Sequence, residues 1–143
     1  MKRRFRIRTK SMLMMLAAAI CFLPVVLLAG NYTIDHYEFG KIIVNGITYE
    51  KDIVIMPDGT IRPGPEDMHY VLSNELEEII NTPGIRTLVI GTGDDGNGRM
   101  RKNLIKDIKA KGIILEMMLT KDAVKMLNQT PKDGLVAMLH LNC

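Results

Sequence analysis

The chain has 143 residues, which is enough for a single domain with its own hydrophobic core. Residues 1–30 hold six of the 19 basic residues and none of the 16 acidic ones, so residues 31–143 carry a net charge of −3. An acidic domain gives no electrostatic case for binding nucleic acid. Two cysteines, Cys21 and Cys143, exclude a disulfide framework, and no residues have the spacing of metal ligands.

Residues 1–30 have the composition of a membrane-targeting leader. Six basic residues precede residues 12–29, a run of eighteen residues without a charge that is just long enough to span a bilayer. The positive-inside rule predicts a single N-terminal anchor with its basic end in the cytoplasm. Two alternatives stay open: a cleaved signal, whose cleavage site is poor, would export the domain, and a later true translation start would leave it cytoplasmic.

We expect a single domain over residues 31–143, and its first half is predicted to be rich in β-hairpins. Residues 37–40 open it. Residues 41–49 (KIIVNGITY) read as two short strands around an Asn-Gly pair, which supplies the positive φ angles of a tight turn. Residues 53–61 read as strand, Pro-Asp-Gly turn and resumed extended structure. The two prolines of residues 62–65 (RPGP) predict a loop.

The second half of the domain alternates helices and strands. The spacing of its apolar residues predicts a helix over 74–81, a strand over 87–90, a helix over 103–111, a strand over 113–119, a helix over 121–128 and a strand over 135–141. The strand over 113–119 is apolar at nearly every position, which predicts a central strand covered on both faces. Asn74 and Thr120 are expected to cap their helices, and Gly112 to end the second one.

This order of elements predicts an α/β domain with a mixed central sheet and a β-hairpin layer at one side. Four ordered stretches, IDHYEFGKIIVNGITYEKDIVIMPDG, TLVIGTG…GRM, KGIILEMMLTKDAVKMLN and VAMLHLNC, resemble the Mth938-like family, a domain of unknown function. The resemblance runs from Ile34 to Cys143 and implies a three-layer α/β fold with no established enzymatic activity.

The resembled family includes an adipogenesis-associated protein and an assembly factor of mitochondrial respiratory complex I. The resemblance therefore implies a non-catalytic binding or assembly module with a protein partner. Family members often carry a tryptophan-rich segment with Arg and Gly-His after the second hairpin. Here that stretch is IRPGPEDMHY, in which Arg62 and His69 match two positions while the tryptophans are absent.

A glycine-rich loop, residues 91–98 (GTGDDGNG), follows the strand over 87–90. Its first six residues fit the G-x-G-x-x-G pattern, and Glu116 lies twenty residues further on, as in a dinucleotide site. Three features oppose that interpretation: the charges of Asp94 and Asp95, a following helix that starts too late to meet phosphates, and a domain too small for two nucleotide-binding halves. A structural turn is favoured, and no cofactor is expected. A nucleotide- or phosphate-binding protein or enzyme using this loop is the alternative.

We predict that the glycine-rich loop and its surroundings form the functional surface by shape rather than by catalysis. Crevices in open α/β sheets lie beyond the carboxyl ends of the strands, and glycines let a partner approach closely. The candidate surface comprises Gly91, Thr92, Gly93, Asp94, Asp95, Gly98, Arg99 and Arg101, with Arg62 and His69 nearby if the second hairpin folds over this edge.

The sequence contains no convincing nucleophile–base pair. Asp94 and Asp95 are too few for a cation cage. His140 lies in an apolar strand, where a hydrogen-bonded structural role is commoner than that of a base. Cys143 lies three residues further along the same strand, so its side chain points to the opposite face and cannot pair with His140 directly. No catalytic residue or metal ligand is assigned, a non-enzymatic role is favoured, and the oligomeric state stays open.

Overall fold

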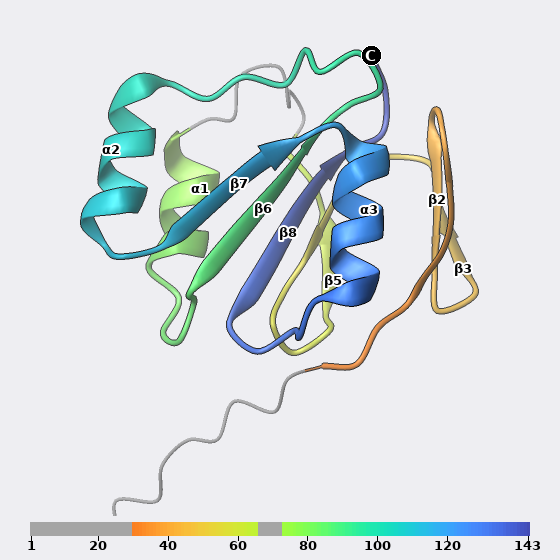
Figure 1. Cartoon of the computed structure of the whole chain (residues 1–143), viewed down its shortest axis with the longest axis horizontal. Helices are drawn as coiled ribbons and strands as arrows, with labels where there is room; N and C mark the ends of the chain where they lie inside the picture. Colours follow the sequence, from red (N-terminus) through yellow and green to blue (C-terminus); the bar gives the residue numbers. More distant parts are fainter. Residues whose placement is uncertain (1–29, 66–72) are drawn as a thin grey trace, which may run out of the picture.

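The computed structural model describes residues 30–65 and 73–143 (Figure 1). Its elements, in chain order, are β1 (Ile34–Glu38), β2 (Lys41–Val44), β3 (Ile47–Tyr49), β4 (Ile53–Ile55), β5 (Ile61–Pro63), α1 (Ser73–Ile80), β6 (Thr87–Thr92), α2 (Lys102–Ala110), β7 (Ile114–Met118), α3 (Thr120–Gln129) and β8 (Leu135–His140). Three predicted features lie outside the part that is described: the anchor over residues 12–29, His69 and the capping side chain of Asn74. Within the described residues, no helix has the length and apolar character needed to cross a membrane.

Five strands form the central sheet in the order β5-β4-β8-β6-β7. Strands β8, β6 and β7 run parallel, while β4 is antiparallel to both β8 and β5, so the sheet is mixed as predicted. Strand β8 is buried at every position because β4 and β6 flank it and side chains cover both of its faces. The last strand in the chain therefore lies at the centre of the sheet.

Strand β7 corrects the prediction of a central strand over residues 113–119. It lies at the edge of the sheet with β6 on one side only, and Ile114 and Met117 are 59% and 37% exposed. Its apolar composition is close to that of β8, but β8 returns between β4 and β6 and takes the central place. The position of a strand in the sheet is thus set by the connection through α3. A run of apolar residues does not predict that connection.

Two further sequence predictions need correction. Strand β5 continues through Arg62 and Pro63, so the segment predicted as a loop begins as an edge strand. Pro63 pairs with Ile53 there, and an edge strand accommodates proline because its outer side needs no donor. Strand β1 begins at Ile34, three residues before the stretch over 37–40 with which the β structure was expected to open.

Two hydrophobic layers enclose the central sheet, with α1 and α2 on one face and α3 on the other (Figure 1). Most of the apolar residues that recur at helical spacing are buried in these layers: Leu76, Ile79 and Ile80 in α1, Leu104 and Ile108 in α2, and Ala123 and Leu127 in α3. Ile105 and Val124, which the same spacing predicts to face inward, are only half-buried. Helix α2 ends as predicted, because Gly112 has a φ of 73° and its amide donates to the main-chain oxygen of Lys109.

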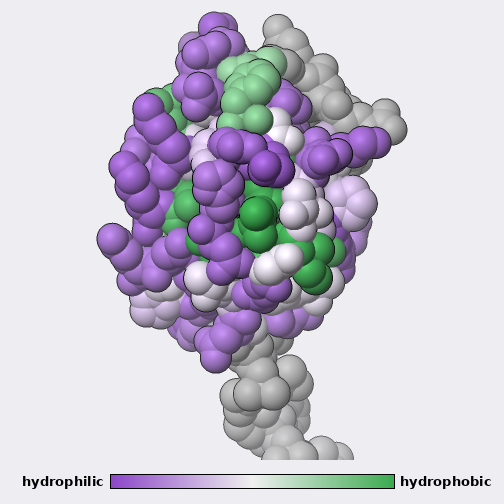
Figure 2. All heavy atoms as spheres, turned by 90° about the vertical axis from the view of Figure 1, so that its right-hand side faces the viewer, coloured by the Kyte–Doolittle hydropathy of each residue, from purple (hydrophilic) through white to green (hydrophobic). Residues whose placement is uncertain are grey.

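A three-stranded antiparallel sheet, in the order β1-β2-β3, shares the α3 face of the central sheet. Asn45 and Gly46 make the predicted hairpin turn with φ angles of 50° and 76°. The side chain of Asn128 in α3 makes two hydrogen bonds with the main chain of Ile34. Its oxygen accepts from the amide of Ile34 at 3.0 Å, and its nitrogen donates to the carbonyl of Ile34 at 2.9 Å. Figure 2 shows this side of the molecule, mostly hydrophilic with a few hydrophobic side chains between. The chain thus has the predicted three-layer α/β fold.

Candidate functional site

The glycine-rich loop leaves the carboxyl end of β6, beside the end of β8. In the sheet register, Gly91 pairs with Leu139 and Thr92 with His140. The base of the loop is buried at residues 91–93 and again at Gly98, whereas residues 94–97 are exposed. The loop therefore consists of a packed base and a solvated tip.

Two glycines at the base lie so close to other parts of the protein that a side chain would not fit. A Cβ atom on Gly93 would overlap the main-chain oxygens of both Asn142 and Cys143, and its φ of 92° is a left-handed conformation. A Cβ atom on Gly91 would lie 2.7 Å from Oγ1 of Thr120. Gly91 thus allows the end of β6 to approach the start of α3, and Gly93 allows it to approach the segment after β8.

Three amides of the loop are already hydrogen-bonded within the protein. The amide of Gly93 donates to Oγ1 of Thr120 at 2.9 Å. The amides of Asp95 and Gly98 donate to the main-chain oxygens of Cys143 at 2.7 Å and Thr92 at 2.9 Å. A phosphate-binding loop instead points such amides at its ligand. This loop uses them for its own architecture.

Thr120 holds the loop to β8 instead of capping its helix. Its hydroxyl accepts from the amide of Gly93 and donates to the carbonyl of His140 at 2.6 Å, and the residue is fully buried. The N-cap residue of α3 is Leu119, with no side-chain capping bond. The predicted capping role of Thr120 is wrong because a contact between distant strands takes up the hydroxyl.

A buried Asp52–His140 pair, which the sequence analysis missed, lies at the same end of the central sheet as the glycine-rich loop. One Asp52 carboxylate oxygen lies 2.6 Å from Nδ1 of His140, and the other accepts the amide of Leu141 at 2.8 Å. The main-chain oxygen of Asp52 accepts the amide of Gly64 at 2.7 Å. Asp52 therefore ties the ends of β5 and β8 together, and His140 has the structural hydrogen bond that was predicted for it. The only local sign of this pair in the sequence was that Asp52, an acidic residue, directly precedes an apolar strand.

Strand β1 and the turn after it border the loop on the α3 face. Burial raises the pKa of the Tyr37 phenol, and the nearby carboxylate of Asp94 raises it further. The amide of Gly40 donates to the main-chain oxygen of Leu141 at 2.8 Å, which fixes the turn against β8. Phe39 in that turn is 64% exposed. An exposed aromatic side chain and an acidic loop tip thus share this end of the molecule.

Only part of the predicted surface is exposed, because Gly91, Thr92, Gly93 and Gly98 are buried in the base of the loop. Asp94, Asp95, Arg99 and Arg101 are exposed on the loop and the segment leading to α2. Arg62 lies on β5, separated from β6 by two strands, and pairs with Glu78 of α1 at 3.2 Å. In the part of the chain that is described, no group of three or more metal-ligating side chains is present.

Solved structures with this fold come from several microorganisms. The conserved hypothetical protein PH1505 from Pyrococcus horikoshii is 25% identical, with a TM-score of 0.70, 78% of this chain covered and 99% of that one. An outer membrane protein from Bartonella henselae is 21% identical, with a TM-score of 0.66 and coverage of 80% and 98%. A Mth938-like domain from Bordetella pertussis is 18% identical, with a TM-score of 0.57 and coverage of 83% and 89%.

Curated proteins give no significant match. The family described as "Protein of unknown function (DUF498/DUF598)" matches residues 34–140. The motifs that first suggested the resemblance fall inside this match, apart from the last residues of the chain. The chain therefore belongs to the DUF498/DUF598 family, with the Mth938-like fold.

Proposed function

We propose that the protein is a non-catalytic binding module, similar in role to an assembly factor, that engages a protein partner. The main support is the division of the glycine-rich loop into a base consumed by internal contacts and an exposed, charged tip. Loops positioned by a rigid scaffold are frequent binding elements. A tip with Asp94 and Asp95 beside Arg99 and Arg101 offers both charge signs to a polar protein surface.

The internal hydrogen bonds of the loop weigh against the alternative, a nucleotide or phosphate site. The amides of Gly93, Asp95 and Gly98 would have to leave their present acceptors before they could bind a phosphate. The carboxylates of Asp94 and Asp95 would also lie beside the ligand's negative charge. Equilibrium dialysis of the protein against nucleotides and sugar phosphates tests this directly, and saturable binding of any of them would favour the alternative.

The proposal places the domain at a membrane, tethered through residues 12–29. Its support is the run of eighteen uncharged residues behind a basic segment. Alkaline extraction of membranes that contain the full chain is expected to leave the protein in the pellet. Protease accessibility then reports the side on which the domain lies, and release into the soluble fraction would refute the tether.

Partner binding through the loop tip is tested by crosslinking and pull-down of the full chain from native membranes. A double variant, Asp94→Ala with Asp95→Ala, is compared with the unaltered chain. Loss of a specific partner in the double variant, at an unchanged melting temperature, is the expected result. Recovery of every partner by the double variant would place the binding surface elsewhere.

A further inference from the structure

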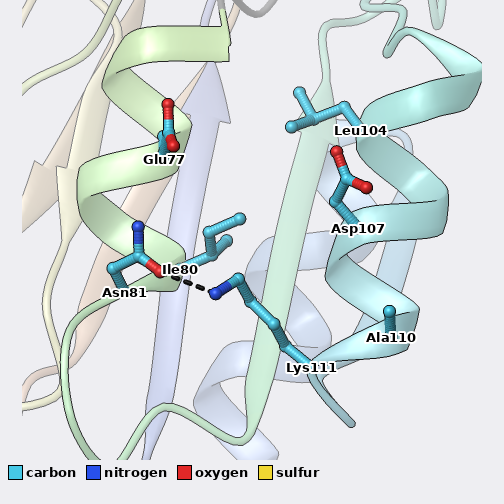
Figure 3. A pocket seen from close by; sticks show the side chains of 7 residues that line it. All are labelled: Glu77, Ile80, Asn81, Leu104, Asp107, Ala110 and Lys111. Atoms are coloured by element: carbon cyan, nitrogen blue, oxygen red, sulfur yellow. Dashed lines mark hydrogen bonds between the residues drawn. The ribbon is translucent and has the colours of Figure 1, made fainter.

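A groove between α1 and α2 lies on the opposite face of the central sheet from α3. Its volume is about 380 Å³, and Figure 3 shows the side chains that line it: Glu77, Ile80, Asn81, Leu104, Asp107, Ala110 and Lys111. The chain passes from α1 to the start of β6 and from α2 to the start of β7. The groove therefore opens toward the amino ends of these strands, away from the glycine-rich loop.

The floor of the groove is apolar, and its two walls are acidic. Ile80 and Leu104 are buried core residues that reach it from α1 and α2 respectively (Figure 3). Glu77 on α1 and Asp107 on α2 are both exposed. Among the described residues, neither carboxylate has an ion-pair partner, although Glu78 next to Glu77 pairs with Arg62.

The cation that lines the groove, Lys111, reaches across it from the end of α2 to Asn81 (Figure 3). Nζ of Lys111 donates to the side-chain oxygen of Asn81 at 2.6 Å, a bond that closes one end of the groove (Figure 3). Helix α1 has no basic residue in its last turn to offset the partial negative charge of its terminal carbonyls. The space above Ile80 and Leu104 thus has a carboxylate on each side, Glu77 and Asp107, and the ammonium group of Lys111 at one end.

We infer that this groove binds an arginine side chain presented by a partner polypeptide. An alkyl stem can lie on the floor formed by Ile80 and Leu104 while the charged head meets carboxylates. Guanidinium presents several donors in one plane and can contact carboxylates from Glu77 and Asp107 together, which the point charge of an ammonium group does less well. This site is separate from the loop tip and does not depend on the role proposed for it.

The test uses the full-length protein and a blocked pentapeptide, acetyl-Gly-Ala-Arg-Ala-Gly-amide, at low ionic strength. Amide resonances of Asn81, Ala110 and Lys111 are followed by NMR as the peptide is added. We expect saturable shifts at these residues that weaken with added salt. The same peptide with citrulline, which keeps the shape of arginine without its charge, is expected to give none, and the lysine peptide is expected to bind more weakly.

A charge-removing double variant, Glu77→Gln with Asp107→Asn, is expected to weaken binding of the arginine peptide about tenfold, as two partly exposed charge contacts are lost. The matched control, Glu50→Gln with Asp122→Asn, removes the same two charges elsewhere on the surface and is expected to leave affinity within about twofold. Equal shifts from the arginine and citrulline peptides would overturn the inference. So would equal loss of affinity in the two double variants, or shifts confined to other residues. The peptide comparison decides the matter even if a variant fails to fold.

Discussion

The two ends of the central sheet use their polar groups in opposite ways. At the carboxyl ends of β6 and β8, Thr120, Asp52 and the loop amides are bonded to the protein's own backbone and side chains. In the groove between α1 and α2, Glu77 and Asp107 face solvent across an apolar floor. Polar groups that are buried and paired fix a structure, whereas exposed and unpaired ones are available to a ligand. The glycine-rich loop is the motif that most resembles a binding site, but its buried base therefore serves mainly to hold the structure together.

The largest effect is expected for Gly93→Ala. Its Cβ would overlap two main-chain oxygens and sit on a left-handed residue. Left-handed backbone alone costs about 1–2 kcal/mol and forced overlap costs about 1–3 kcal/mol more, so a loss near ~4 kcal/mol of unfolding free energy is expected. Gly112→Ala is the control, because Gly112 has a φ of 73° but nothing within 4 Å of its Cβ position.

Urea denaturation of the two variants separates strain from overlap. The control should lose only the cost of the backbone conformation, about 1–2 kcal/mol. Equal losses in the two variants would mean that the loop base tolerates a side chain. The close approach of β6 to the segment after β8 would then be less important than the structure indicates.

Removal of the Asp52 carboxylate is expected to have the next largest effect. In Asp52→Ala, the amide of Leu141 and the ring of His140 lose a buried acceptor, which costs about 2–4 kcal/mol. Asp58→Ala serves as the control, since Asp58 accepts the amide of Thr60 in an exposed turn. Thermal unfolding should place Asp52→Ala well below the control. Similar melting temperatures would show that the ends of β5 and β8 do not need this tie.

Thr120→Val is expected to cost about 2 kcal/mol, because it leaves the amide of Gly93 and the carbonyl of His140 without their hydroxyl partner. Valine keeps the shape of threonine, so packing is little changed. Thr48→Val, on the exposed face of β3, is the matched control and should be neutral. Chemical denaturation of both proteins gives the comparison, and a neutral Thr120→Val would contradict the role assigned to the hydroxyl.

Features with a local cause were predictable from the sequence. The Asn45-Gly46 turn and the helix end at Gly112 each depend on positive φ angles within a few residues. The apolar stripes of the three helices follow from spacing alone. The resemblance to the family supplied the layered arrangement of these elements.

Features with a long-range cause were not predictable. Strands β7 and β8 have similar apolar composition, and only the crossover through α3 places β8 at the centre. Asp52 and His140 are 88 residues apart and meet only because β4 and β8 pair. Thr120 stands where the sequence predicts a helix cap, but its hydroxyl hydrogen-bonds to the ends of two strands that are distant in the sequence. The groove between α1 and α2 likewise depends on how two helices pack on one face.

A smaller effect is expected at the groove. Lys111→Met removes the exposed hydrogen bond to Asn81 and should cost about 0.5–1 kcal/mol of stability. The same change removes the positive charge that lines the groove, so the affinity for the arginine pentapeptide should rise. The melting temperature and the NMR titration are measured on one preparation. Weaker peptide binding would mean that the bond to Asn81 shapes the site for its ligand.

The smallest effect on stability is expected for the loop tip, in Asp94→Ala with Asp95→Ala. Both side chains are exposed, and the amide of Asp95 still donates to the main-chain oxygen of Cys143, so the change should stay within about 0.5 kcal/mol. The variant should nevertheless lower the pKa of Tyr37, because the charge of Asp94 contributes to raising it. Burial, the larger cause, remains, so the pKa should stay above its usual value. A pH titration of tyrosine absorbance measures this shift, with Tyr37→Phe to assign it. An unchanged pKa at an unchanged melting temperature would show that the tip does not lie over β1, and a large drop in melting temperature would make the tip part of the structural base.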